Sequence, residues 1–128
     1  GESNFLIAQV INGSGQNPAV QLAGNTLVLQ GKESVLHGKD AITLAVRPEQ
    51  LKLLTSPGAN QFDWRLPAVI SASIFIGPEE RVEVTLADGQ KLKILKRSRV
   101  NDIAAEFQKD DQVFVGINAR DLHLYDLK

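Results

Sequence analysis

The chain has 128 residues, with 14 basic and 15 acidic side chains, a formal net charge of -1 and no cysteine. A domain of this length buries roughly two thirds of its unfolded surface, so we expect one ordinary hydrophobic core. The absence of cysteine excludes disulfides, thiolate metal ligands and cysteine nucleophiles, and the near-neutral charge argues against bulk attraction to nucleic acid or an anionic membrane. Because the chain starts at Gly1 and contains no methionine, we expect a piece of a longer protein or a processed product.

Short apolar runs rich in β-branched residues predict β-strands along most of the chain, because glycine and polar turn residues bound each run. In chain order the runs span residues 4–11, 26–30, 41–46, 66–77, 81–95, 112–117 and 122–127. Alternation in the run 66–77 predicts that its even-numbered residues share one face of a strand. These residues are Ala68, Ile70, Ala72, Ile74 and Ile76.

The run 81–95 predicts a β-hairpin that turns at Asp88-Gly89. Apolar and polar residues alternate on both sides of this dipeptide, and Asp-Gly suits a tight turn in which both central residues have positive φ. Among the remaining segments, 100–109 has helical spacing. Many strands with at most one short helix predict an all-β sandwich or barrel, and the loop-like segment 55–61 divides it into two halves.

Motifs for nucleotide and metal chemistry are missing from the sequence. A P-loop needs a glycine five residues before Gly-Lys and a hydroxyl residue after it, and neither Gly31-Lys32 nor Gly38-Lys39 meets both conditions. The two histidines, His37 and His123, do not have the i, i+4 spacing of a zinc pair. We therefore predict no catalytic residue, no cofactor and no metal site in this chain.

Two polar segments remain as candidate binding surfaces. A basic cluster could bind single-stranded nucleic acid in an OB-type fold, but no aromatic residue interleaves with it, so we expect a solvated face or a surface for an acidic partner. The segment NGSGQN (12–17) could supply backbone amides to an anion, or it could be a plain loop. The cluster consists of Lys91, Lys93, Lys96, Arg97 and Arg99.

The stretch AVRPEQLKL (45–53) breaks a strand with a charged pair around a proline. Pro48 lacks an N–H and has a fixed φ, so it ends a strand without losing a ladder hydrogen bond. Arg47 offers a planar fork of donors to a carboxylate or to carbonyl groups, and Glu49 can accept from backbone amides. We interpret Arg47 and Glu49 as structural contacts at a crossover between two halves, rather than as ligand-binding residues.

The order of four segments resembles the C-terminal regulatory region of ABC importer ATP-binding subunits of the maltose/sugar, polyamine and ferric-iron types, which contains the transport-associated OB-fold (TOBE) domain. The segments are NFL (4–6), LAVRPEQLKL (44–53), VISASIFIGPEERVEVTLADGQKL (69–92) and VFVGINARDLHLYD (113–126). The residues that carry the resemblance, as structural motif positions, are Arg47, Pro48, Glu49, Gly77, Asp88 and Gly89.

This resemblance implies a single TOBE-type domain over residues 1–128, built from two small interleaved OB-fold-like β-barrels split near 55–61. It implies a non-catalytic regulatory and dimerisation module that forms a homodimer at the cytoplasmic face of the cell membrane. ATP and magnesium would belong to an ATPase domain that this chain lacks. The other implied partners are the membrane permease subunits and a regulatory protein, with no nucleic acid expected.

Two other functions remain open at this point. Related TOBE modules bind oxyanions between paired barrels, so the resemblance also allows a small-oxyanion sensor. An OB-fold that binds nucleic acid is the third alternative, which the near-neutral charge and the sparse aromatic residues disfavour.

Overall fold

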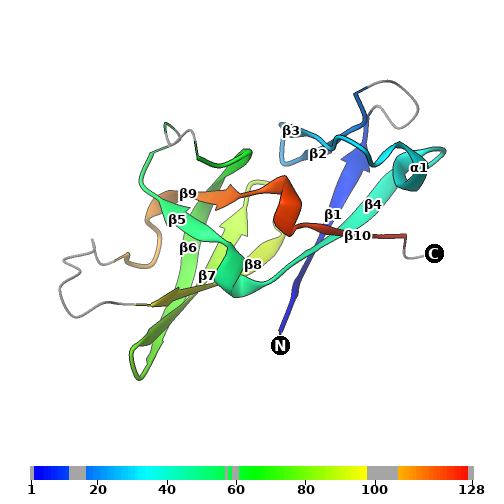
Figure 1. The fold of residues 1–128 in the computed structure, drawn as a ribbon. Helices are drawn as coiled ribbons and strands as arrows, with labels where there is room; N and C mark the ends of the chain where they lie inside the picture. Colours follow the sequence, from blue (N-terminus) through cyan, green and yellow to red (C-terminus); the bar gives the residue numbers. More distant parts are fainter. Residues whose placement is uncertain (1, 12–16, 57, 59–60, 98–106, 127–128) are drawn as a thin grey trace.

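The computed structural model describes residues 2–11, 17–56, 58, 61–97 and 107–126. Their strands form two five-stranded antiparallel sheets (Figure 1). The first sheet has the order β10-β4-β1-β2-β3 and the second β5-β9-β6-β7-β8. The predicted all-β fold is therefore confirmed, with α1 (Glu33–Leu36) as the single α-helix of the described residues.

The bounds of the strands and short helical turns follow the chain in order. The first sheet contains β1 (Asn4–Val10), β2 (Ala19–Leu22), β3 (Asn25–Val28), β4 (Ala41–Val46) and β10 (His123–Tyr125). The second contains β5 (Lys52–Leu54), β6 (Trp64–Ile76), β7 (Glu79–Leu86), β8 (Lys91–Arg97) and β9 (Gln112–Ile117). The 3-10 turns are η1 (Pro48–Gln50) and η2 (Ala119–Asp121).

The two sheets are interleaved in sequence, because the chain leaves the first sheet and later returns to it. It leaves after β4 through η1 and returns through η2 to β10, which pairs with β4. The segment 55–61 connects β5 and β6, and both of these strands pair with β9. The change of sheet therefore lies at residues 47–51, earlier than the split that the loop-like composition of 55–61 suggests.

One hydrophobic core fills the space between the inward faces of both sheets. Leu6 and Leu44 of the first sheet and Leu66 and Val115 of the second are completely buried, and all four belong to one continuous cluster.

The sequence analysis did not predict strands β2 and β5 or helix α1, because each has only three or four residues. The helix predicted at 100–109 falls mostly on residues outside the described ranges.

A β-bulge in β6 changes the predicted facing of its even-numbered residues. Ile70 pairs with Val84, but the next register pair is Ala72 with Glu83, so Ser71 is one extra residue on β6. An extra residue reverses the alternation beyond it. Ile70 is therefore completely buried, whereas Ile74 is 60% exposed, and the prediction that Ala68 to Ile76 share one face is wrong beyond the bulge.

The predicted hairpin of β7 and β8 is confirmed, but its turn differs from the one expected. Gly89 has a φ of 91°, and Asp88 is not among the residues with positive φ. The Gly89 N–H donates to the Leu86 carbonyl, and the Leu86 N–H donates to the Gln90 carbonyl. This is a three-residue loop that ends in a left-handed glycine, the common alternative to the two-residue turn.

Two reciprocal side-chain clamps join the sheets where β1 and β8 lie side by side. The Asn4 amide donates to the Lys93 carbonyl and accepts from the Lys93 backbone N–H, both at 2.8 Å. The Gln90 amide does the same to Ile7, at 2.9 Å and 2.8 Å. Each amide side chain thus satisfies both backbone groups of one residue on the other sheet, as a ladder partner would.

No helix within the described ranges combines the length and the apolar character that crossing a membrane requires.

We predict that Asn4→Ala destabilises the fold, whereas Gln9→Ala, an exposed amide on the same strand, leaves it unchanged. Asn4 is only 7% exposed, and its removal leaves two backbone groups of Lys93 without partners, at a cost of about 1–3 kcal/mol. The expected drop in melting temperature is several degrees, measured by differential scanning calorimetry. Equal melting temperatures for the two variants would contradict a structural role of the clamp.

Candidate functional site

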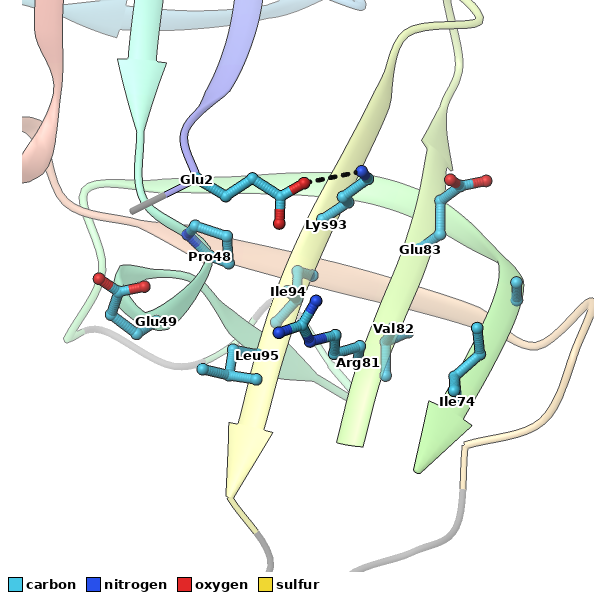
Figure 2. A pocket seen from close by; sticks show the side chains of 11 residues that line it. Glu2, Pro48, Glu49, Ile74, Arg81, Val82, Glu83, Lys93, Ile94 and Leu95 are labelled. Carbon is cyan, nitrogen blue, oxygen red and sulfur yellow. Dashed lines mark hydrogen bonds and ion pairs between the residues drawn. The ribbon is translucent and has the colours of Figure 1, made fainter. Parts of the chain in front are cut away.

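A pocket of about 340 Å³ lies on the outer face of β6, β7 and β8. Its side chains form two cross-strand rows, because the register aligns Ala72, Glu83 and Lys93 in one row and Ile74, Arg81 and Leu95 in the next. Figure 2 labels the side chains of these rows other than Ala72, with Glu2 and with Pro48 and Glu49 of η1 on the β8 side of the pocket. Val82 and Ile94 complete the lining.

The bulge at Ser71 builds the floor of this pocket. Beyond it, Ala72 and Ile74 turn from the core face to the outer face. The small side chain of Ala72 lies opposite Glu83 and leaves room between the longer side chains of the row. The pocket therefore depends on a local irregularity of β6, as functional sites beside bulges often do.

The charged side chains of the pocket are mostly paired. The Lys93 Nζ lies 3.0 Å from the Glu2 Oε1, and the Lys91 Nζ lies 3.6 Å from the Glu83 Oε1. By contrast, the guanidinium of Arg81 has no carboxylate at ion-pairing distance among the described residues. Arg81 is thus a cation of the pocket that is available to a ligand.

The electrostatics of Glu2 show that its carboxyl lies near two cations of the pocket. The hydrogen bond from Lys93 and then its charge lower the pKa of the Glu2 carboxyl from its usual 4.5. Desolvation opposes this shift, and the charge of Arg81 makes the smallest contribution, again towards a lower pKa. Arg81 and Lys93 are diagonal neighbours on β7 and β8, a separation of roughly 7–8 Å that long side chains bridge. The Glu2 carboxylate therefore samples the field of both cations.

The motif Arg47-Pro48-Glu49 lies at the crossover from the first sheet to the second, and two of its residues line the pocket. The side-chain hydrogen bonds here come from the next residue, Gln50. Its Oε1 accepts from the Arg47 backbone N–H at 3.2 Å, and its Nε2 donates to the Asp121 Oδ1 at 3.5 Å. Gln50 thus ties η1 to η2, and the structural role expected of Arg47 and Glu49 stays a prediction.

The remaining motif positions lie at the two ends of β7, away from one another. Gly77 is the tip residue of the β6–β7 hairpin, with a φ of 61°, and Asp88-Gly89 belongs to the β7–β8 loop. The structure does not gather these three residues into a site with Arg47. The pocket residues Glu2, Ile74 and Arg81 were missed, because only the bulge and the clamps bring them together.

The lysines of the basic cluster contact different partners and do not form one free cationic surface. Lys91 and Lys93 are paired with Glu83 and Glu2, and the Lys96 Nζ lies 5.0 Å from the centre of the Phe107 ring. Arg99 and most of the segment 12–17 fall outside the described residues, and so does any anion site there. Within the described ranges, no three His, Asp or Glu side chains gather as metal ligands.

Comparison with known proteins places this architecture in a family. Residues 44–124 match the TOBE domain family, which is more than half of the chain, so the chain belongs to that family. The fold also resembles a solved structure of the cytoplasmic molybdate-binding protein ModG with molybdate bound, with a TM-score of 0.70 over 94% of each chain at 15% identity. This likeness confirms the OB-fold-like class. A search of curated proteins finds no significant sequence match.

We predict that the Glu2 carboxyl titrates below 4.5 in the intact protein and moves back towards it in Lys93→Gln, because the variant removes both the hydrogen bond and the nearby charge. The matched control is Lys91→Gln, on the same strand but outside the pocket lining. Titration of the side-chain carboxyl carbon by NMR measures all three values.

The sign of the effect on stability follows from the direction of the shift. A carboxyl whose pKa is lowered on folding stabilises the protein above its unfolded pKa, and this contribution disappears as the pH falls through the folded value. Because the pair is exposed, the loss is small. If the pKa of Glu2 were the same in Lys93→Gln as in the unmodified protein, the ion pair would be contradicted.

Proposed function

We propose that this chain is a non-catalytic binding module that takes a small oxyanion in the pocket of β6, β7 and β8. The observation that carries the proposal is the Glu2 carboxylate, an anionic oxygen that Lys93 already holds at 3.0 Å beside Arg81. Membership of the TOBE family and the likeness to a molybdate-binding protein support it. Recognition of such an anion needs few groups, namely the two cations Arg81 and Lys93 and an opening to solvent.

Arg81 and Lys93 contribute different parts of the recognition. The planar guanidinium of Arg81 offers two parallel N–H donors, which match two oxygens of a carboxylate or a tetrahedral oxyanion. The ammonium of Lys93 acts as a compact charge with three donors. An oxyanion that contacts both cations exchanges with the Glu2 carboxylate, and the exchange costs little because exposed ion pairs are weak.

Isothermal titration calorimetry with molybdate, sulfate and phosphate at low ionic strength tests this function. We expect binding that Arg81→Gln and Lys93→Gln each weaken about tenfold, the loss of one charge-assisted hydrogen bond. Glu2→Gln removes the internal competitor and strengthens binding.

The matched control is Lys52→Gln, which removes an exposed cation of β5 outside the pocket lining. An absence of binding heat for all three anions would refute the proposed function. If Lys52→Gln weakened binding as much as Lys93→Gln, the anion would not bind in this pocket.

A second function is favoured by the position of Arg47-Pro48-Glu49. The family match starts at residue 44, just before this crossover motif, and extends to residue 124. This supports a regulatory and dimerisation module of an ABC importer ATP-binding subunit for sugar, polyamine or iron uptake. Such a module would work at the cytoplasmic face of the membrane, with an ATPase domain, permease subunits and a regulatory protein as partners.

Homodimer formation is the part of this second function that can be tested on this chain alone. We predict that sedimentation equilibrium detects a dimer whose population rises with protein concentration. A monomer at every accessible concentration would contradict dimerisation through this region and would leave oxyanion binding untouched. Walker A and Leu-Ser-Gly-Gly-Gln motifs in the coding sequence upstream of Gly1 would identify the importer class.

A further inference from the structure

The pocket is larger than a bare inorganic oxyanion requires. Its volume is about 340 Å³, within the usual range for sites that bind small organic molecules. A five-atom oxyanion fills on the order of 60–90 Å³, the space of two or three waters at roughly 30 Å³ each. Such an anion at Arg81 and Lys93 would leave most of the pocket to water.

The rest of the pocket is lined by apolar side chains that adjoin the cations. Ile74 and Leu95 flank Arg81 in the same cross-strand row, and Pro48 of η1 lies on the β8 side of the pocket (Figure 2). Ile74 is 60% exposed, which leaves apolar area that a ligand can cover. An anionic head on Arg81 therefore brings any attached carbon chain against Ile74 or Leu95.

The carboxylates of the pocket limit a ligand to a single anionic group. The lining holds two cations, Arg81 and Lys93, and three carboxylates, Glu2, Glu49 and Glu83. Lys93 is paired with Glu2, and Glu83 is paired with Lys91. Arg81 has no such partner among the described residues. One carboxylate satisfies its fork of donors, whereas a second anionic group would meet Glu83 or Glu49 in the same lining.

From size, lining and charge together, we infer that the pocket selects small aliphatic monocarboxylates over bare inorganic oxyanions. The carboxylate binds the Arg81 guanidinium, and the carbon chain lies against Ile74, the more exposed of the two apolar side chains that flank Arg81. This inference rests on the proposed function, because it assigns the body of the ligand whose anionic head occupies the same site.

NMR titration of the protein with acetate, butyrate and hexanoate, with sulfate as the reference anion, tests the inference at constant ionic strength. We expect affinity to rise with chain length by up to about fourfold for each buried methylene. Sulfate should bind no more tightly than acetate. Shifts should be confined to the backbone amides of β6, β7, β8 and η1.

A pair of matched variants locates the apolar subsite. Ile74 and Ile76 lie on the same strand and are 60% and 53% exposed, but Ile74 alone of the two lines the pocket. We expect Ile74→Ser to remove most of the dependence on chain length while acetate and sulfate bind as before. Ile76→Ser should behave as the unmodified protein does.

The outcomes separate this inference from the proposed function. Hexanoate that binds no better than acetate, while sulfate and acetate both bind, overturns the inference and leaves the anion site standing. The failure of every anion to bind refutes the proposed function and the inference with it. A loss of chain-length dependence in Ile76→Ser equal to that in Ile74→Ser overturns the placement of the carbon chain in this pocket.

Discussion

The arrangement of this molecule depends on the paired amide clamps between β1 and β8. Asn4 and Lys93 are 89 positions apart in the sequence, yet one side chain satisfies both backbone groups of the other residue. Gln90 and Ile7 repeat the arrangement in the opposite direction. These four hydrogen bonds fix how the N-terminal strand lies along the second sheet, and they bring Glu2 to the mouth of the pocket. An amide serves here because it carries a donor and an acceptor on one rigid group.

The pocket itself arises from an irregularity in an otherwise regular sheet. Strict alternation would have placed Ala72 and Ile74 in the core with Ile70, and the outer face of β6 would then present Ser73 and Phe75 beside Arg81. The extra residue at Ser71 exchanges the two sets. It places a small and a branched apolar side chain next to a cation, which is the combination that an amphipathic anion needs. The half of β6 before the bulge therefore packs in the core, and the half after it supplies side chains to the pocket.

Sequence patterns predicted the parts of this fold that depend on neighbouring residues. The alternation in 81–95 correctly predicted the β7–β8 hairpin, and the proline after Arg47 correctly marked the place where the chain leaves the first sheet. The bulge was missed because a strand with an extra residue has the same composition as one without it. The clamps and the Glu2–Lys93 pair were missed because the contacting residues are 83 to 91 positions apart. Nothing local specifies which amide will meet a distant backbone or which carboxylate will meet a distant lysine.

The separation between clamp and ion pair explains how a ligand can enter without disturbing the fold. Asn4 binds the backbone of Lys93, whereas Glu2 binds its side chain. An incoming anion displaces only the side-chain contact, because the backbone clamp keeps β1 in place. Glu2 then remains tethered two residues from Asn4 and competes at a high effective concentration. Because the pair is exposed, this competition lowers the affinity only several-fold. Glu2 therefore favours ligands that also gain binding energy from the apolar lining. The Glu2 carboxylate cannot compete for that lining, because its tether to β1 is short.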